Sequence, residues 1–131
     1  MSYRFLIVEE SATTRAGIKR AIRQSDVGGP GASFVEAATG REAMEALAAD
    51  ARIDLALVDL RLPDMDAAEL VGRVLAEPDT RGIPVIVMAA RPEQATLDAL
   101  RRRGVKGHLR MPITSESFRA VAGQILEPTH V

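Results

Sequence analysis

The sequence predicts one α/β domain over residues 1–131, in which a parallel sheet is covered by helices on both faces. Five short apolar segments alternate with five segments of helical periodicity. Two of the apolar segments, 55–58 and 83–88, are almost continuous, which is typical of strands buried on both faces. This alternation favours parallel pairing, because a helix between two strands returns the chain to the same end of the sheet.

The first two strand–helix units are strand-forming segments followed by helix caps. Residues 3–8 and 33–37 favour strands. Ser11 can cap the helix after the first strand, and Thr39 with Glu42 forms a capping box after the second. The apolar spacing predicts these buried helix positions: Ile18, Ala21, Ile22, Ala43, Met44 and Leu47.

Two polar features of this region have no assigned chemistry. Arg15, Lys19 and Arg23 recur every four residues along the first helix, which we interpret as a solvated basic face. The glycine-rich loop 27–31 precedes a strand, whereas a phosphate-binding loop precedes a helix. We therefore expect a surface loop there and no phosphate site.

The last three units are marked by helix caps and breakers. Their strands are predicted over residues 55–58, 83–88 and 107–110. Their helices are expected to begin near Asp66, Pro92 and Thr114. Gly104 is suited to end the fourth helix. The expected buried helix positions are Leu70, Val71, Val74, Leu75, Ala95, Leu97, Leu100, Phe118, Val121, Ala122, Ile125 and Leu126.

Composition excludes several classes of protein. Hydrophobic residues make up 47% of the chain, enough for a core, and the net charge of −1 provides no general attraction to nucleic acid or anionic lipid. The absence of cysteine excludes disulfides and thiolate metal sites. No apolar run approaches the roughly 18 residues of a membrane helix, and the start of the chain does not resemble a signal peptide. We expect a cytoplasmic protein with no nucleic-acid or membrane partner.

Carboxylates directly follow two of the predicted strands. Glu9 and Glu10 come after the first strand, and Asp59 after the third. Open parallel sheets bind ligands at the carboxyl ends of their strands, so these side chains converge if the two strands are neighbours. Crowded carboxylates raise one another's pKa unless a cation such as Mg²⁺ offsets the repulsion. The alternative is that each acid only stabilises the N-terminus of the next helix.

Four stretches carry a specific resemblance to a known family, and the resemblance covers nearly the whole chain. They are FLIVEES, VDLRLPDMD, IPVIVMAA and GVKGHLRMPI, beginning at residues 5, 58, 83 and 104. They resemble a response-regulator receiver domain of the CheY-like type. The resemblance implies a doubly wound five-stranded parallel sheet in the order 2-1-3-4-5 with five helices, a CheY/flavodoxin-like fold. It also implies phosphorelay function in two-component signal transduction, with a histidine kinase or another signalling protein as partner.

The resemblance also assigns roles to the acidic residues. Asp59 matches the phospho-acceptor of the family. Glu9 and Glu10 match the acidic pair that helps to hold Mg²⁺, together with Asp59 and the backbone carbonyl of Arg61. No organic cofactor is implied. The family usually has a cis bond before its last proline, so we expect a cis bond before Pro112.

The chain departs from the family where the chemistry is performed. Family members usually have Thr or Ser at the position of Ala89, Lys at Met111 and an aromatic residue at His108. A phosphoryl group needs charge-assisted donors, and neither Ala89 nor Met111 has a side-chain donor. Arg110 is no substitute for Met111, because neighbouring strand residues point to opposite faces, and Lys106 and His108 share the parity of Arg110.

We therefore expect an atypical receiver, a protein-interaction module with little or no phosphorylation-dependent switching and no enzymatic activity. The alternative is a working phospho-acceptor that uses Asp59 with Mg²⁺ held through Glu10 or Glu9. A remote alternative is a small-ligand-binding protein or enzyme on the same fold. The chain has no dinucleotide-binding or phosphate-loop motif, and His108 and His130 have no evident acidic partner.

A basic surface is expected beside the last strand. In receivers the face of the fourth helix, fifth strand and fifth helix usually meets partners or a second copy. We expect an acidic partner or a weak homodimer there, with His108 as a partly buried structural or interface residue. The alternative is that these cations lie there only because positive charge is favourable near the C-terminal end of a helix. The residues of this face are Arg91, Arg101, Arg102, Arg103, Lys106 and His108.

Overall fold

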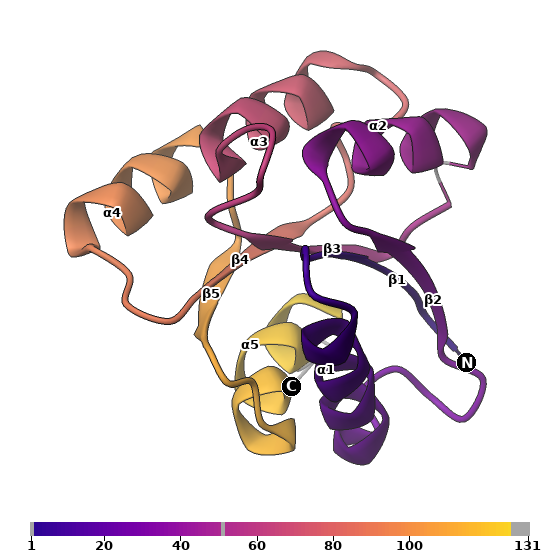
Figure 1. The fold of residues 1–131 in the computed structure, drawn as a ribbon. Coiled ribbons are helices and arrows are strands. Elements are labelled where there is room, and N and C mark those ends of the chain that lie inside the picture. Colours follow the sequence, from indigo (N-terminus) through magenta and orange to yellow (C-terminus); the bar gives the residue numbers. More distant parts are fainter. Residues whose placement is uncertain (1, 51, 127–131) are drawn as a thin grey trace.

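The computed structural model describes residues 2–50 and 52–126, in which strands and helices alternate (Figure 1). The strands are β1 (Arg4–Val8), β2 (Ser33–Ala37), β3 (Leu55–Asp59), β4 (Val85–Ala89) and β5 (Gly107–Arg110). The helices are α1 (Ala12–Ser25), α2 (Gly40–Ala49), α3 (Ala67–Ala76), α4 (Gln94–Arg103) and α5 (Ser115–Leu126). All of these elements were predicted, although β4 begins two residues later than expected.

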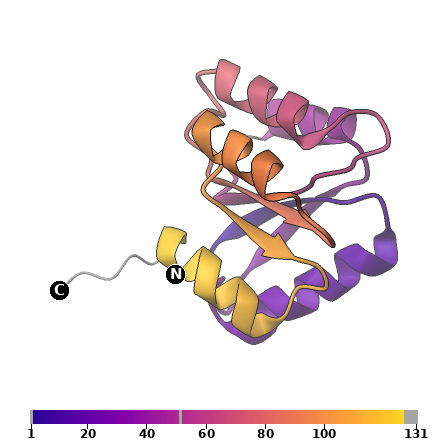
Figure 2. The same ribbon diagram turned by 90° about the vertical axis from the view of Figure 1, so that its left-hand side faces the viewer.

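The strands form one parallel sheet in the order β2-β1-β3-β4-β5, which confirms the predicted fold class. Helices α1 and α5 cover one face of the sheet, and α2, α3 and α4 cover the other (Figures 1 and 2). In the register of β1 and β3, Val8 lies opposite Val58. The residues that follow these two valines therefore emerge side by side at the carboxyl edge of the sheet.

The core consists of two apolar layers, one on each face of the sheet. Leu55 and Leu57 pack on the side of α1 and α5, whereas Ala56 and Val58 pack on the other side. These four side chains are all at least 97% buried, which explains why the strand reads as a continuous apolar run. Within residues 2–50 and 52–126, no helix has both the length and the apolar character needed to cross a membrane.

The predicted caps are present at four helix ends. Ser11, Thr39 and Asp66 each accept a hydrogen bond from a backbone N–H in the first turn of their helix. Gly104 ends α4 with φ of 118°, a conformation that L side chains rarely adopt. The start of α4 differs from our expectation, because the helix begins after Pro92 and its cap residue, Glu93, makes no side-chain cap bond.

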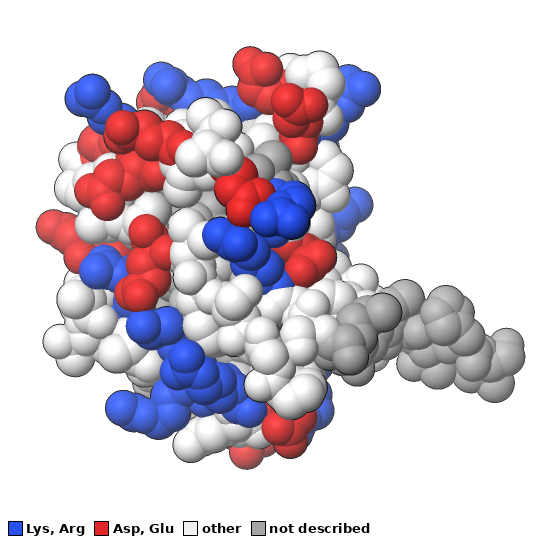
Figure 3. All heavy atoms as spheres, turned by 90° about the vertical axis from the view of Figure 1, so that its right-hand side faces the viewer, with Lys and Arg blue, Asp and Glu red and all other residues white. Residues whose placement is uncertain are grey.

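Two predicted features of the helices are wrong. Ala95 of α4 is exposed, since only Leu97 and Leu100 of that helix are buried. The basic stripe of α1 is also not a free solvated face. Arg15 and Lys19 each form a 2.9 Å ion pair with Glu36 on β2, and Arg23 lies 4.9 Å above the ring of Phe34. Figure 3 shows basic side chains gathered over α1 on this side of the molecule. The stripe thus attaches α1 to β2, an edge strand. Edge strands have unpaired backbone groups that can pair with another chain, and charged side chains beside them oppose such pairing.

Candidate functional site

The two acidic strand ends meet at the carboxyl edge of the sheet. Glu9 directly follows β1 and is only 8% exposed, and half-buried Asp59 is the last residue of β3. Each carboxylate accepts a hydrogen bond from the backbone N–H two residues further along the chain, Ser11 for Glu9 and Arg61 for Asp59. The backbone turns therefore fix both carboxylates in place.

The two carboxyl groups crowd each other. Burial raises the pKa of Glu9, and the neighbouring Asp59 carboxyl raises it further. The Ser11 N–H and the Arg15 guanidinium act in the opposite direction, but the net effect is an increase. Negative charge at this edge therefore carries a free-energy cost in the absence of an added cation.

Arg15 fixes the backbone of the acidic pair, a role that the sequence did not indicate. Its Nη1 donates to the carbonyl oxygens of Glu9 (2.6 Å) and Glu10 (3.1 Å), while its Nε pairs with Glu36. The four-residue spacing of the α1 stripe placed Arg15 on the surface of the helix, but a helix pattern cannot reveal which loop a long side chain reaches. Arg15 is thus a structural support for the β1–α1 loop.

A pocket of about 830 Å³ opens beside these carboxylates. Ala89, at the end of β4, and half-buried Met111, after β5, both line it, as the resemblance implied. Glu10 is exposed and is not among its lining residues. The described lining residues that carry charge are Glu9, Asp59, Arg61, Asp66, Arg91 and Glu93. We refer to this cavity as the acceptor pocket, after the role that the resemblance implies for Asp59.

The acceptor pocket offers a divalent cation fewer ligands than we expected. Within the described part of the chain, no group of three or more His, Cys, Asp or Glu side chains is arranged to hold a metal ion. Glu9 and Asp59 nevertheless converge, and Arg61 lines the same pocket. This donor set fits Mg²⁺, which proteins commonly hold through one or two carboxylates and water. Glu10 does not line the pocket, so it would act on a bound Mg²⁺ only from outside it.

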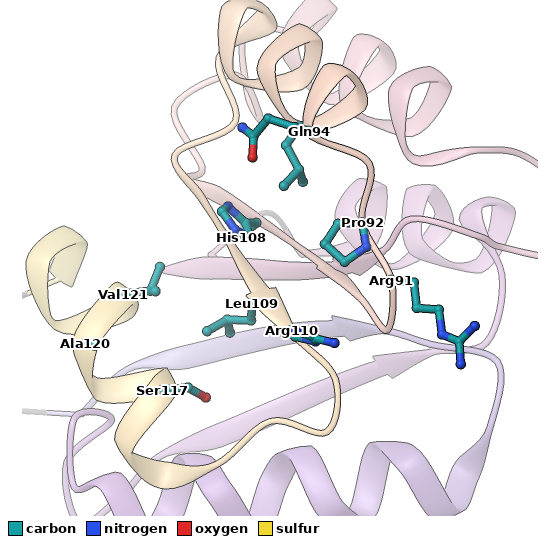
Figure 4. A pocket seen from close by; sticks show the side chains of 10 residues that line it. Arg91, Pro92, Gln94, His108, Leu109, Arg110, Ser117, Ala120 and Val121 are labelled. Atoms are coloured by element: carbon teal, nitrogen blue, oxygen red, sulfur yellow. The ribbon is translucent and has the colours of Figure 1, made fainter.

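A second, shallower hollow of about 570 Å³ lies between α4, β5 and α5 (Figure 4). Its floor is largely apolar, and its cationic or titratable lining residues are Arg91, His108 and Arg110. His108 is exposed, not partly buried as we expected. The burial of β5 alternates strictly, with His108 and Arg110 exposed on one side, and neither residue lines the acceptor pocket, where Met111 stands in place of the family's usual Lys. We refer to this cavity as the output hollow, because it lies on the face where we expect a partner to bind.

The expected basic face is only partly assembled around the output hollow. Arg101 lines a small indentation beside His108. Arg103 extends toward α3 instead, where its Nη1 lies 3.8 Å from a Cβ built on Gly72. Lys106 is exposed just before β5 and does not line the hollow. The bond between Met111 and Pro112 is cis, as predicted, and His130 lies outside the described residues.

A family model described as the response regulator receiver domain matches residues 5–122. The chain belongs to this family. Receiver domains serve two-component signalling and interact with histidine kinases and other signalling proteins, and they typically bind Mg²⁺ at the phosphorylation site.

Individual relatives agree with this assignment. The receiver is 27% identical over 116 residues to chemotaxis protein CheY1 of Helicobacter pylori, covering 88% of this chain and 90% of that protein. It is 33% identical over 115 residues to protein-glutamate methylesterase/protein-glutamine glutaminase 4 of Myxococcus xanthus, covering 87% of this chain but 31% of that protein. The solved structure of chemotaxis response regulator CheY4 of Vibrio cholerae has a TM-score of 0.81 at 23% identity, covering 96% of this chain and 100% of the other.

Proposed function

We propose that this receiver acts as an interaction module whose output surface responds little, or not at all, to phosphorylation of Asp59. The observation that carries the proposal is that Ala89 and Met111 line the same pocket as Asp59. A phosphoryl group on Asp59 would bring strongly accepting oxygens, and neither of these side chains can donate to them. Without a hydroxyl at Ala89, the pocket also lacks the group that reports phosphorylation in the family.

The first test restores the missing donors. The wild-type protein, the double variant Ala89→Thr/Met111→Lys and the control Asp59→Asn are incubated with acetyl phosphate and Mg²⁺, and intact mass is recorded. We expect no stable adduct on the wild type, an adduct on the double variant and none on Asp59→Asn. Near-stoichiometric, stable phosphorylation of wild-type Asp59 would contradict the proposal.

The second candidate function is a working phospho-acceptor, which the convergence of Glu9 and Asp59 favours. Two carboxylates in one pocket match the one or two through which proteins commonly hold Mg²⁺. If this candidate is correct, Mn²⁺ binding measured by paramagnetic relaxation should be weakened by Asp59→Asn and by Glu9→Gln, but hardly by Glu10→Gln. A folded wild-type protein that shows no response up to millimolar Mn²⁺ or Mg²⁺ would exclude it.

The proposed function is non-enzymatic. The methylesterase relative is matched over only 31% of its length, so its name does not transfer to this chain. Signalling then depends on a surface that binds a partner. The output hollow is our candidate for this surface, and its lining combines apolar residues such as Leu97 and Val121 with the cations Arg91 and Arg110. This chemistry suits an acidic partner segment with an apolar side chain, or a weak homodimer.

Charge reversal tests the partner surface with a control on the same helix. Arg101→Glu/Arg110→Glu reverses two charges at the output hollow and its margin, whereas Arg103→Glu reverses one charge on the side toward α3. We expect the double variant to lose pull-down partners or self-association measured by sedimentation velocity, and Arg103→Glu to retain both. Partners and oligomeric state that are unchanged in the double variant would refute this surface.

A further inference from the structure

The segment between β3 and α3 is a closed loop that forms one wall of the acceptor pocket. Arg61 pairs with Asp66 in an isolated antiparallel bridge, and the N–H of Ala67 donates to the carbonyl oxygen of Leu60 at 3.3 Å. These two contacts close the base of the segment, which we call the 60–67 loop. All four residues line the acceptor pocket. The geometry of this wall therefore depends on where the 60–67 loop lies.

The tip of the 60–67 loop is attached to the first turn of α2, which lies beside it (Figure 1). The two carboxylate oxygens of Asp64 accept separate hydrogen bonds from the backbone N–H groups of Gly40 and Arg41, each 2.9 Å long. N–H groups in the first turn of a helix have no carbonyl partner in their own helix, so they are free to bind this carboxylate. The N–H of Arg41, followed by that of Gly40, lowers the pKa of Asp64. Both hydrogen bonds are therefore charge-assisted.

Packing at the tip supports the same attachment. Gly40 is buried, and a Cβ built on it lies 2.5 Å from Sδ of Met65. Met65 is half-buried and packs against the apolar layer on the side of α2, α3 and α4. Asp64, by contrast, is exposed. The tip thus combines one apolar contact with two hydrogen bonds, and the hydrogen bonds can be removed without opening the core.

The carboxylates around the 60–67 loop have different partners. Asp59 accepts from the N–H of Arg61, and Asp66 accepts from the N–H of Glu69 in the first turn of α3. Both of these bonds stay within the continuous segment from β3 to α3. Among the described residues, Asp64 is the only member of the loop whose side chain forms a hydrogen bond with a different part of the fold. Asp64 is therefore the polar link between the loop and α2.

We propose that Asp64 is a positioning residue of the acceptor pocket. By holding the tip of the 60–67 loop against α2, it fixes the base of the loop and, with it, the backbone at Arg61 beside Asp59. Mg²⁺ demands near-ideal geometry from its oxygen ligands, so a fixed backbone at this point is what a metal site in the pocket requires. The role does not depend on phosphorylation of Asp59 or on any partner in the output hollow.

Amide hydrogen exchange, measured residue by residue by NMR on the metal-free full chain, tests this role. Asp64→Ala removes both hydrogen bonds at an exposed position. We expect faster exchange of the Gly40 and Arg41 amides and, at the base of the loop, exchange of the Arg61 and Ala67 amides that is about tenfold faster. Asp64→Asn keeps one acceptor oxygen and should give an intermediate acceleration at the same amides.

Thr39→Ala is the matched control, because it weakens the same turn of α2 without removing the link to the loop. Thr39 accepts from the N–H of Glu42 at 3.0 Å, a bond that lies wholly at the start of α2. We expect this variant to speed exchange of the Glu42 amide and to leave the Arg61 and Ala67 amides unchanged.

Two results would overturn the positioning role. One is unchanged exchange of the Arg61 and Ala67 amides in Asp64→Ala, which would make Asp64 only a cap of α2. The other is equal acceleration of these amides in Thr39→Ala, which would assign the effect to fraying of the helix. Neither phosphorylation nor partner binding enters the measurement, so this inference can fail while the proposed function stands.

Discussion

Glu9 is the residue at which the acceptor pocket opposes ionisation of a carboxyl group. Its carboxyl is nearly buried and faces the Asp59 carboxyl, and both features raise its pKa above the ordinary value of 4.5. The protonated form therefore stabilises the fold below that value, and this contribution is lost as pH rises through the folded-state pKa. At neutral pH without metal, ionised Glu9 destabilises the receiver.

Replacing Glu9 by a side chain that does not ionise should remove this cost. We expect Glu9→Gln to raise the free energy of unfolding at pH 7 and to change it much less at pH 4, where the wild-type carboxyl is largely protonated. Urea denaturation in the presence of a chelator at both pH values measures the difference. Glu10→Gln, at an exposed position outside the pocket, serves as the control and should be neutral. An equal effect of Glu9→Gln at both pH values would show that charge is not the cause.

At the scale of elements, the output hollow depends on the close approach of α5 to β5. Gly107, at the start of β5, is buried, and a Cβ built on it lies 2.8 Å from Cγ1 of Val121 on α5. Real Cβ contacts are essentially never this short, so any larger residue must displace the Val121 side chain or the helix that carries it. A Cβ built in the same way on Gly123, in the last turn of α5, meets no heavy atom of another element within 4 Å.

These two glycines provide a matched pair of substitutions. We expect Gly107→Ala to destabilise the receiver by about 1–3 kcal/mol through overpacking. Gly123→Ala should be neutral or stabilising by up to about 1 kcal/mol, since alanine is the better helix former. Chemical denaturation of both variants measures the difference. Similar effects at the two positions would mean that backbone conformation, and not the contact with Val121, determines the role of Gly107.

At the scale of the whole molecule, one aromatic cluster joins the edge of the sheet to the last helix. The chain has three phenylalanines, and Phe5 contacts both of the others with ring centroids 5.8 Å apart. Phe118 of α5 is fully buried, whereas Phe34 of the edge strand is half-buried. Arg119 donates to the carbonyl of Ser25, which also fixes α5 against the end of α1.

Removing the ring of Phe118, the fully buried member of this cluster on α5, should strongly lower the free energy of unfolding of the whole domain. We expect Phe118→Ala to cost about 3–5 kcal/mol, a large part of the roughly 5–15 kcal/mol that stabilises a typical domain. Phe34→Ala should cost clearly less, because that ring is already partly in water. Thermal and urea unfolding of the two variants tests the ranking. A cost at Phe34 that equals or exceeds the cost at Phe118 would place the critical packing at the sheet edge.

The sequence alone determined the elements, their alternation and most of their caps. Apolar periodicity and capping residues act within a few neighbouring residues, so Ser11, Thr39 and Asp66 are readable without a fold. The sheet order and the cis bond before Pro112 were predicted from the family resemblance alone, and both are confirmed. The exposure of His108 could not be predicted from the sequence, because the burial of a strand residue depends on where the adjacent helices lie.

Only the tertiary structure decided how the long charged side chains are used. Arg15 reaches the backbone of the acidic pair, Arg103 turns toward α3, and Arg91 lies between two cavities. Helix and strand patterns specify the face on which a residue lies, but an arginine stem spans several possible neighbours from that face. Which neighbour it meets depends on strand order, loop path and nearby charge, all of which are set by residues distant in the sequence.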